Sequence, residues 1–121
     1  MTRWGLVRKL IPSNDMGIKY DWQRPYWYGV IPTSAVAELV KVAEEGRGAG
    51  PEIKAPTLII HAFDDKIISY QGSKSFYQSL SGVAADQKRL IIFPNGHHNL
   101  TIDLNPRKAE VFGWINEFIG K

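Results

Sequence analysis

The sequence contains no cysteine among its 121 residues. Disulfide bridges, thiolate metal sites and a cysteine nucleophile are therefore excluded. Long apolar runs are also missing, because no stretch approaches the roughly 20 apolar residues that cross a bilayer. Residues 1–4 are not followed by the apolar core of a secretory signal, so we expect a cytoplasmic protein with no membrane span.

The net charge is small, since 15 basic and 12 acidic side chains leave a formal charge of +3. Hydrophobic residues make up 44% of the chain, aromatic residues 12% and charged residues 22%, which is typical of a globular domain and unlike a disordered chain. The length allows one small domain with a single core.

The charge excess is concentrated near the N-terminus, where residues 1–25 contain five basic and two acidic side chains. The basic residues are Arg3, Arg8, Lys9, Lys19 and Arg24, and the aromatic residues that follow or interrupt them are Tyr20, Trp22, Tyr26, Trp27 and Tyr28. Interleaved basic and aromatic groups can bind single-stranded nucleic acid, but they are commoner in lids and loops. No nucleic-acid-binding motif accompanies them, so we expect no such partner and keep this function only as an alternative.

Regular patterns begin near residue 30. Pro32, Thr33 and Ser34 supply a helix start, apolar residues recur at helical spacing, and Gly46 offers a helix end. The apolar positions of this helix are Val36, Leu39, Val40 and Ala43. We therefore interpret residues 1–50 as a cap-like or lid-like segment with one helix.

Residues 51–121 alternate between two apolar runs and two helical patterns. The runs 57–60 and 90–93 are predicted strands, and the first, apolar at consecutive positions, is expected to be buried on both faces. A helix is predicted over 69–80, and Pro106 opens a last helix that Gly120 ends. The inward side chains expected are Phe76, Tyr77 and Leu80 on the first helix, and Val111, Phe112, Ile115, Phe118 and Ile119 on the second. The order β, α, β, α predicts an α/β fold.

Two loops of this fold contain the residues whose side chains can take part in catalysis. Strands joined through a helix are normally parallel, so the loops at 61–66 and 94–99 should lie side by side at the edge where α/β sheets bind ligands. A carboxylate on one loop and a histidine on the next suit a serine hydrolase, because the carboxylate fixes the imidazole that deprotonates the nucleophile. Asp65 and His98 fit this spacing, and Asp64 is an alternative acid. A metal site is another alternative, formed by His61, Asp64, His97 and His98, although their spacing matches no common ligand motif.

These two loops resemble a known family. The run I-K-A-P-T-L-I-I-H at residues 53–61, followed by Asp64 and Asp65, resembles the acid-bearing strand and turn of the α/β-hydrolase superfamily. The run P-N-G-H-H-N at residues 94–99 is similar to the family's histidine turn. The carboxylesterase and monoacylglycerol lipase branch is most similar, also over residues 32–42, where that branch has a cap.

The resemblance implies a fold, an activity and roles for residues. Residues 51–121 would be the C-terminal βαβα portion of an α/β-hydrolase core, and the substrate would be a small carboxylic ester. His98 would be the general base and acid, Asp65 would orient it, and no cofactor would be needed. Trp22, Tyr26 and Trp27 would line an apolar acyl pocket in the cap, or simply pack within it.

One part that the resemblance implies is missing. The family's nucleophile lies in a G-x-S-x-G elbow that precedes the acid and the histidine, and no serine of this chain has glycines at both offsets. We therefore expect a fragment or truncated product that is inactive alone. Two strands make a poor sheet, so a second chain or self-association should complete it. A non-catalytic interaction module with a hydrolase-derived fold is the alternative.

Overall fold

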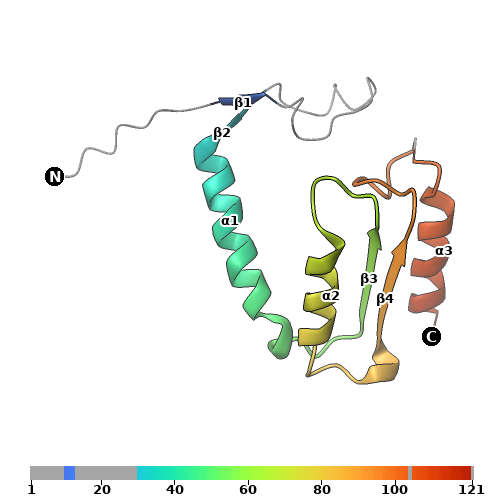
Figure 1. The fold of residues 1–121 in the computed structure, drawn as a ribbon. Helices are drawn as coiled ribbons and strands as arrows, with labels where there is room; N and C mark the ends of the chain where they lie inside the picture. The colour runs from blue at the N-terminus through green and yellow to red at the C-terminus, as the bar shows by residue number, and fades with distance from the viewer. Residues whose placement is uncertain (1–9, 13–29, 104, 121) are drawn as a thin grey trace. The chain divides into compact units, whose positions relative to one another are not determined.

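The computed structural model describes residues 10–12, 30–103 and 105–120, which fall into two compact units, residues 1–46 and 47–121. In the first unit β1 (Leu10–Pro12) pairs antiparallel with β2 (Val30–Pro32), although the sequence predicted only irregular structure there (Figure 1). Each strand ends in an isoleucine–proline pair, and both β-branching and a following proline favour extended backbone.

Helix α1 (Thr33–Gly48) follows directly and ends two residues later than Gly46, where the sequence predicted its end. Among the described residues, a Cβ added at Gly46 or Gly48 would meet nothing within 4 Å, so the space around these positions does not require glycine. None of the residues of α1 is buried, and Leu39 and Val40 of the predicted stripe are 65% and 48% exposed. The predicted apolar stripe is therefore present but uncovered in the described part of the chain.

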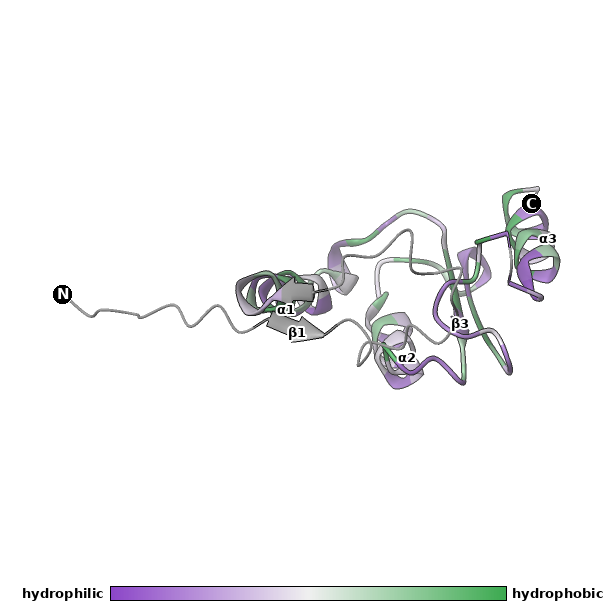
Figure 2. Cartoon of the chain, turned by 90° about the horizontal axis from the view of Figure 1, so that it is seen from above, coloured by the Kyte–Doolittle hydropathy of each residue, from purple (hydrophilic) through white to green (hydrophobic). Residues whose placement is uncertain are grey.

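The second unit contains a parallel pair of strands, as predicted. Strand β3 (Thr57–Ala62) runs beside β4 (Lys88–Phe93), with Thr57 opposite Lys88 and Ala62 opposite Phe93. Helix α2 (Tyr70–Ser79) connects them, and α3 (Lys108–Ile119) follows β4. Short 3₁₀ turns, η3 (Gly50–Glu52) and η4 (Ala85–Gln87), precede the two strands. Figures 1 and 2 show α2 and α3 on opposite sides of the strand pair.

The core lies between the strands and α3. Ala62, Phe93 and Val111 are buried together, and the rings of Phe93 and Trp114 meet edge to face at 5.0 Å. On the α2 side Leu80 is fully buried, with Phe76 and Tyr77 half-buried, as the sequence predicted.

The apolar face of α3 is narrower than expected. Val111 is buried and Ile115 and Phe118 are half-buried, whereas Phe112 and Ile119 are exposed, so their prediction as inward residues was wrong. Helical geometry explains the difference, because residues 111, 115 and 118 share one face and 112 points about 100° away from 111. Trp114, which the prediction omitted, packs in the core.

Burial of the first strand on both faces was also a wrong expectation for most of its length. Residues 57–60 are only half-buried, and burial is confined to His61 and Ala62 at the carboxyl end. Among the described residues β3 has one strand neighbour, β4, which leaves its other edge without a partner strand. In the same part of the chain, no helix has the length and apolar content required to cross a membrane.

Candidate active site

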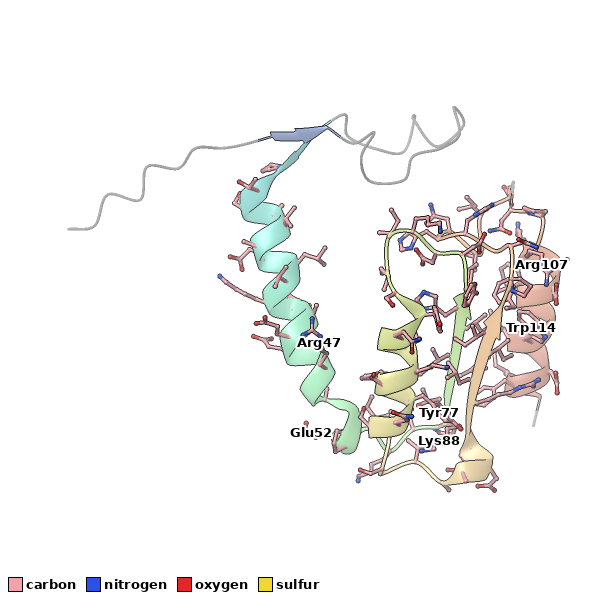
Figure 3. All side chains as sticks on the ribbon, in the orientation of Figure 1. Arg47, Glu52, Tyr77, Lys88, Arg107 and Trp114 are labelled. Atoms are coloured by element: carbon pink, nitrogen blue, oxygen red, sulfur yellow. The ribbon has the colours of Figure 1, made fainter. Side chains whose placement is uncertain are left out.

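The loops after β3 and β4 meet at the carboxyl ends of the two strands. The backbone N–H of Phe63 donates to the carbonyl oxygen of Phe93 at 2.7 Å, which continues the parallel pairing to the last residue. The register of the strands therefore brings residues 63–68 next to residues 94–99. Figure 3 shows this end of the unit, with Arg107 labelled beside it and Trp114 further along α3.

Asp65 contacts His98 directly. Its Oδ2 lies 2.9 Å from Nδ1 of His98, and its Oδ1 accepts hydrogen bonds from the N–H groups of Ile67 at 2.8 Å and Ile68 at 3.0 Å. The Asp65 side chain is only 6% exposed. Burial raises its pKa, but the hydrogen bonds from His98, Ile68 and Ile67 outweigh burial and hold the pKa below the ordinary value. Asp65 is thus an ionised acceptor in a fixed orientation.

His98 presents its other ring nitrogen for chemistry. Because the Asp65 carboxylate only accepts, the hydrogen between the two groups belongs to Nδ1 of His98, and the neutral ring then has its lone pair on Nε2. Within the described ranges no group hydrogen bonds to Nε2, and the His98 side chain is 30% exposed. This is the tautomer in which a histidine can take a proton from a neighbouring hydroxyl.

Asp64 contacts a different part of the histidine loop. Its Oδ1 accepts from the backbone N–H groups of Gly96 at 2.9 Å and His97 at 3.0 Å, and its Oδ2 lies 2.9 Å from Nδ1 of His97. Burial raises the pKa of Asp64, but these hydrogen bonds and the charge of His97 outweigh burial, so the net pKa lies below the ordinary value. The structure therefore brings Asp65, and not the alternative acid Asp64, to His98.

The histidine loop needs its particular backbone. Asn95 and His97 have left-handed φ angles of 59° and 56°, and between them a Cβ at Gly96 would lie 2.6 Å from the Phe93 ring and 2.8 Å from Cβ of Ala62. Only glycine fits this space. The loop thus packs tightly on the ends of both strands.

Asn105, whose role was not predicted from the sequence, holds the histidine loop in place. Its buried amide donates to the carbonyl oxygens of Gly96 at 2.7 Å and Asn99 at 2.8 Å, and its Oδ1 accepts from the N–H of Arg107 at 2.8 Å. The Asn-Pro pair at residues 105 and 106 was the available signal, because this pair favours turns.

His61 lies behind Asp65 at the end of β3 and is buried. Its Nδ1 is 2.6 Å from Oγ of Ser73, and its Nε2 is 3.1 Å from the carbonyl oxygen of Ile68 and 3.4 Å from Oδ2 of Asp65. The four residues considered for a metal site are thus divided among protein partners. In the part of the chain that the structure describes, no three His, Asp or Glu side chains are placed to hold a metal ion.

A comparison with known protein families agrees with this geometry. The family model of serine aminopeptidase S33 matches residues 12–105, a span that includes both loops of the site. The chain belongs to this family of α/β-hydrolases. No curated protein matches the chain.

Membership of the S33 family confirms the resemblance to the α/β-hydrolase superfamily and the partial α/β-hydrolase fold. It also establishes a general likeness to hydrolases. The predicted acyl-pocket residues Trp22, Tyr26 and Trp27 lie outside the described residues, so their role stays a prediction.

Apolar side chains do flank the site of this S33 family chain in its described part. Phe63 and Ile68 are 59% and 54% exposed, and they belong to the same loop as Asp65. The Phe63 ring lies 4.8 Å from the Tyr70 ring at the start of α2. The loop that carries Asp65 thus also exposes two apolar side chains.

Proposed function

We propose that this chain carries the acid and the base of a serine hydrolase that cleaves carboxylic esters. The observation that carries the proposal is the 2.9 Å contact between Nδ1 of His98 and Oδ2 of Asp65, which leaves Nε2 of His98 as the proton acceptor. Membership of the S33 family supports a hydrolase in general, and the choice of a carboxylic ester as substrate is part of the proposal.

The proposed chemistry uses His98 twice. Nε2 of His98 takes the proton from a serine hydroxyl as the serine oxygen attacks the ester carbonyl carbon, and Asp65 stabilises the imidazolium that forms. His98 then gives this proton to the leaving alkoxide as the ester C–O bond breaks. Water, deprotonated by His98 in turn, cleaves the acyl-enzyme and returns the serine hydroxyl.

The nucleophile is proposed to come from outside this sequence, because none of its serines has the G-x-S-x-G pattern. The chain alone would then be inactive. We propose that a second chain, or a second copy of this one, pairs with the open edge of β3 and completes the sheet. The single strand neighbour of β3 in the described part of the chain, and the half-exposed residues 57–60, support an edge that takes a further strand.

The proposed substrate is a small ester with an apolar acyl group. Phe63 and Ile68, exposed on the loop that carries Asp65, support apolar recognition. Trp22, Tyr26 and Trp27 are proposed to add to this pocket from the cap-like segment at residues 1–50.

A fluorophosphonate probe tests where the nucleophile lies, because it labels serines that a neighbouring base activates. We expect the folded full-length chain to show no mass increase after treatment. A labelled serine would contradict the proposal that the nucleophile is supplied from outside, and its position would name the nucleophile. Ser73, whose hydroxyl contacts His61, is the serine to inspect first.

A non-catalytic interaction module is the second candidate function. The apolar stripe of α1, in which Leu39 and Val40 are exposed, favours it. Sedimentation and turnover together separate the two functions. A stable complex that shows no turnover with activated esters would favour the interaction module, whereas turnover that depends on His98 would favour the hydrolase.

A further inference from the structure

The proposed chemistry makes no use of His61, although this histidine is buried beside the acid. It is the penultimate residue of β3, 8% exposed, and both ring nitrogens have partners. Nδ1 faces Oγ of Ser73 on α2, and Nε2 faces the carbonyl oxygen of Ile68 and Oδ2 of Asp65. A buried ring that joins a helix, a strand and a catalytic loop constrains that loop.

The partners of His61 fix where its hydrogen lies. The carbonyl oxygen of Ile68 only accepts, so Nε2 of His61 carries a hydrogen and donates it at 3.1 Å. In the neutral ring Nδ1 is then an acceptor, and the Ser73 hydroxyl donates to it at 2.6 Å. Oδ2 of Asp65 lies 3.4 Å from Nε2, close enough for an electrostatic contact with this N–H group.

We propose that His61, oriented by Ser73, is a positioning residue that holds Asp65 in place for His98. The inference rests on the proposed function and adds a residue to it. Oδ1 of Asp65 depends on the backbone N–H groups of Ile67 and Ile68, and His61 holds the carbonyl of that same Ile68. Both backbone polar groups of Ile68 are therefore held, its N–H group by Asp65 and its carbonyl oxygen by His61, which fixes the end of the turn at residues 65–68.

This arrangement also divides the Asp65 carboxylate between two histidines. Oδ2 receives Nδ1 of His98 at 2.9 Å and has Nε2 of His61 at 3.4 Å. The N–H group of His61 is a second positive dipole near Oδ2. It opposes rotation of the carboxylate away from His98, because rotation would move Oδ2 away from both rings. Without His61, Asp65 would keep its partner but lose the support that selects this rotamer.

Two substitutions of His61 separate the effect of its Nε2–H donor from the effect of removing its ring. The side-chain amide of glutamine reaches the place of Nε2, whereas the amide of asparagine reaches only the place of Nδ1. His61→Gln should therefore keep the donor to Ile68 and Asp65, and His61→Asn should lose it. Ser73→Ala removes the group that orients the ring, and Ser75→Ala, at an exposed position of the same helix, is the matched control.

The readout is the low-field proton signal of His98 Nδ1–H, recorded by NMR on the full chain. We expect a low-field signal in the unmodified chain, in His61→Gln and in Ser75→Ala. In His61→Asn and Ser73→Ala we expect the signal to move upfield or to disappear through exchange with water. Unchanged signals in these last two variants would overturn the inference. Near-ultraviolet circular dichroism of the Phe93–Trp114 pair checks folding, and if His61→Asn unfolds, the Ser73→Ala result decides alone.

The same spectra distinguish failure of this inference from failure of the proposed function. Asp65→Asn removes the carboxylate that His98 contacts, so the signal should be lost in that variant. A signal that requires Asp65 but ignores both His61 and Ser73 would overturn only the positioning role. A signal that is absent from the unmodified chain, or indifferent to Asp65→Asn, would overturn the Asp65–His98 pair and with it both proposals.

Discussion

Asp64 and Asp65 are neighbours in the same turn, but they hold different parts of the facing loop. Asp64 accepts from the backbone of Gly96 and His97, which we call the backbone contact. Asp65 accepts from the His98 ring, which we call the ring contact. The Asp64 side chain is 24% exposed and the Asp65 side chain 6%, so the ring contact is the more secluded of the two.

The different partners of Asp64 and Asp65 show how one turn can fix both the backbone position and the tautomer of a histidine. The backbone contact places residues 96 and 97, and therefore the Cα of residue 98, by two amide hydrogen bonds. The ring contact then selects the tautomer of His98. Loss of the ring contact should change chemistry with little effect on folding, whereas loss of the backbone contact should mainly change stability.

The largest effect is expected for the ring contact in a complete enzyme. In a chimera of this chain with the nucleophile-bearing half of an S33 family hydrolase, Asp65→Asn should lower kcat for p-nitrophenyl esters about 10⁴-fold, because the histidine tautomer is no longer fixed. His98→Ala should lower it by about 10⁶-fold. His97→Ala is the control and should keep most activity, and a loss below tenfold for either site variant would contradict the assignment.

Gly96→Ala tests the packing on which both contacts depend. The added methyl would lie 2.6 Å from the Phe93 ring, so the free energy of unfolding should fall by about 1–3 kcal/mol, as overpacked cores do. Gly72→Ala is the matched control, because its Cβ meets no atom and helical alanine is favourable. Urea denaturation measures both. Equal stability of the two variants would show that the loop does not pack as described.

Asp64→Ala should remove the backbone contact, together with the contact between Oδ2 of Asp64 and Nδ1 of His97, and leave Asp65 in place. Two amides of the histidine loop lose their acceptor, which should cost about 1 kcal/mol of unfolding free energy because water partly replaces it. The low-field His98 signal should persist, since Asp65 is untouched. If Asp64→Ala abolished that signal and left stability unchanged, the division of labour between the two aspartates would be wrong.

The smallest effect is the acid dependence of stability. The folded-state pKa values of Asp64 and Asp65 lie below the ordinary value of 3.8, so their stabilising contribution is fully present above that pH. The contribution is lost as the pH falls through the lower, folded-state values. Urea midpoints measured from pH 6 downward should therefore decline below about pH 4, and less steeply for Asp65→Asn. An identical decline in both proteins would contradict the lowered pKa of Asp65.

Much of the second unit could be predicted from sequence. Apolar runs rich in leucine and isoleucine located the strands at 57–60 and 90–93, and the intervening helix made them parallel, which in turn placed Asp65 near His98. The structure extends each strand by two residues, Thr57–Ala62 and Lys88–Phe93, because polar His61 and Lys88 also pair. Strand pairing is a property of the backbone, so hydropathy underestimates its length.

Other features depended on contacts that no local pattern encodes. Asp64 and Asp65 are chemically identical neighbours in the sequence. Their different partners follow from the direction in which each side chain leaves the turn. His61 and Asn105 contact backbone carbonyls, and which carbonyls their side chains reach is decided by the fold. The exposed stripe of α1 is a different case, because the periodicity of the sequence predicted an apolar face but does not indicate which part of a protein covers it.

The proposed base catalysis depends on one tautomer of His98, in which Asp65 holds the hydrogen on Nδ1 and the lone pair is on Nε2. The ¹⁵N chemical shifts of the His98 ring, recorded on the neutral imidazole in the full chain, measure this directly. We expect a protonated Nδ1 and an unprotonated Nε2, and loss of this preference in Asp65→Asn. A ring protonated on Nε2, or one whose tautomer ignores Asp65, would contradict this expectation.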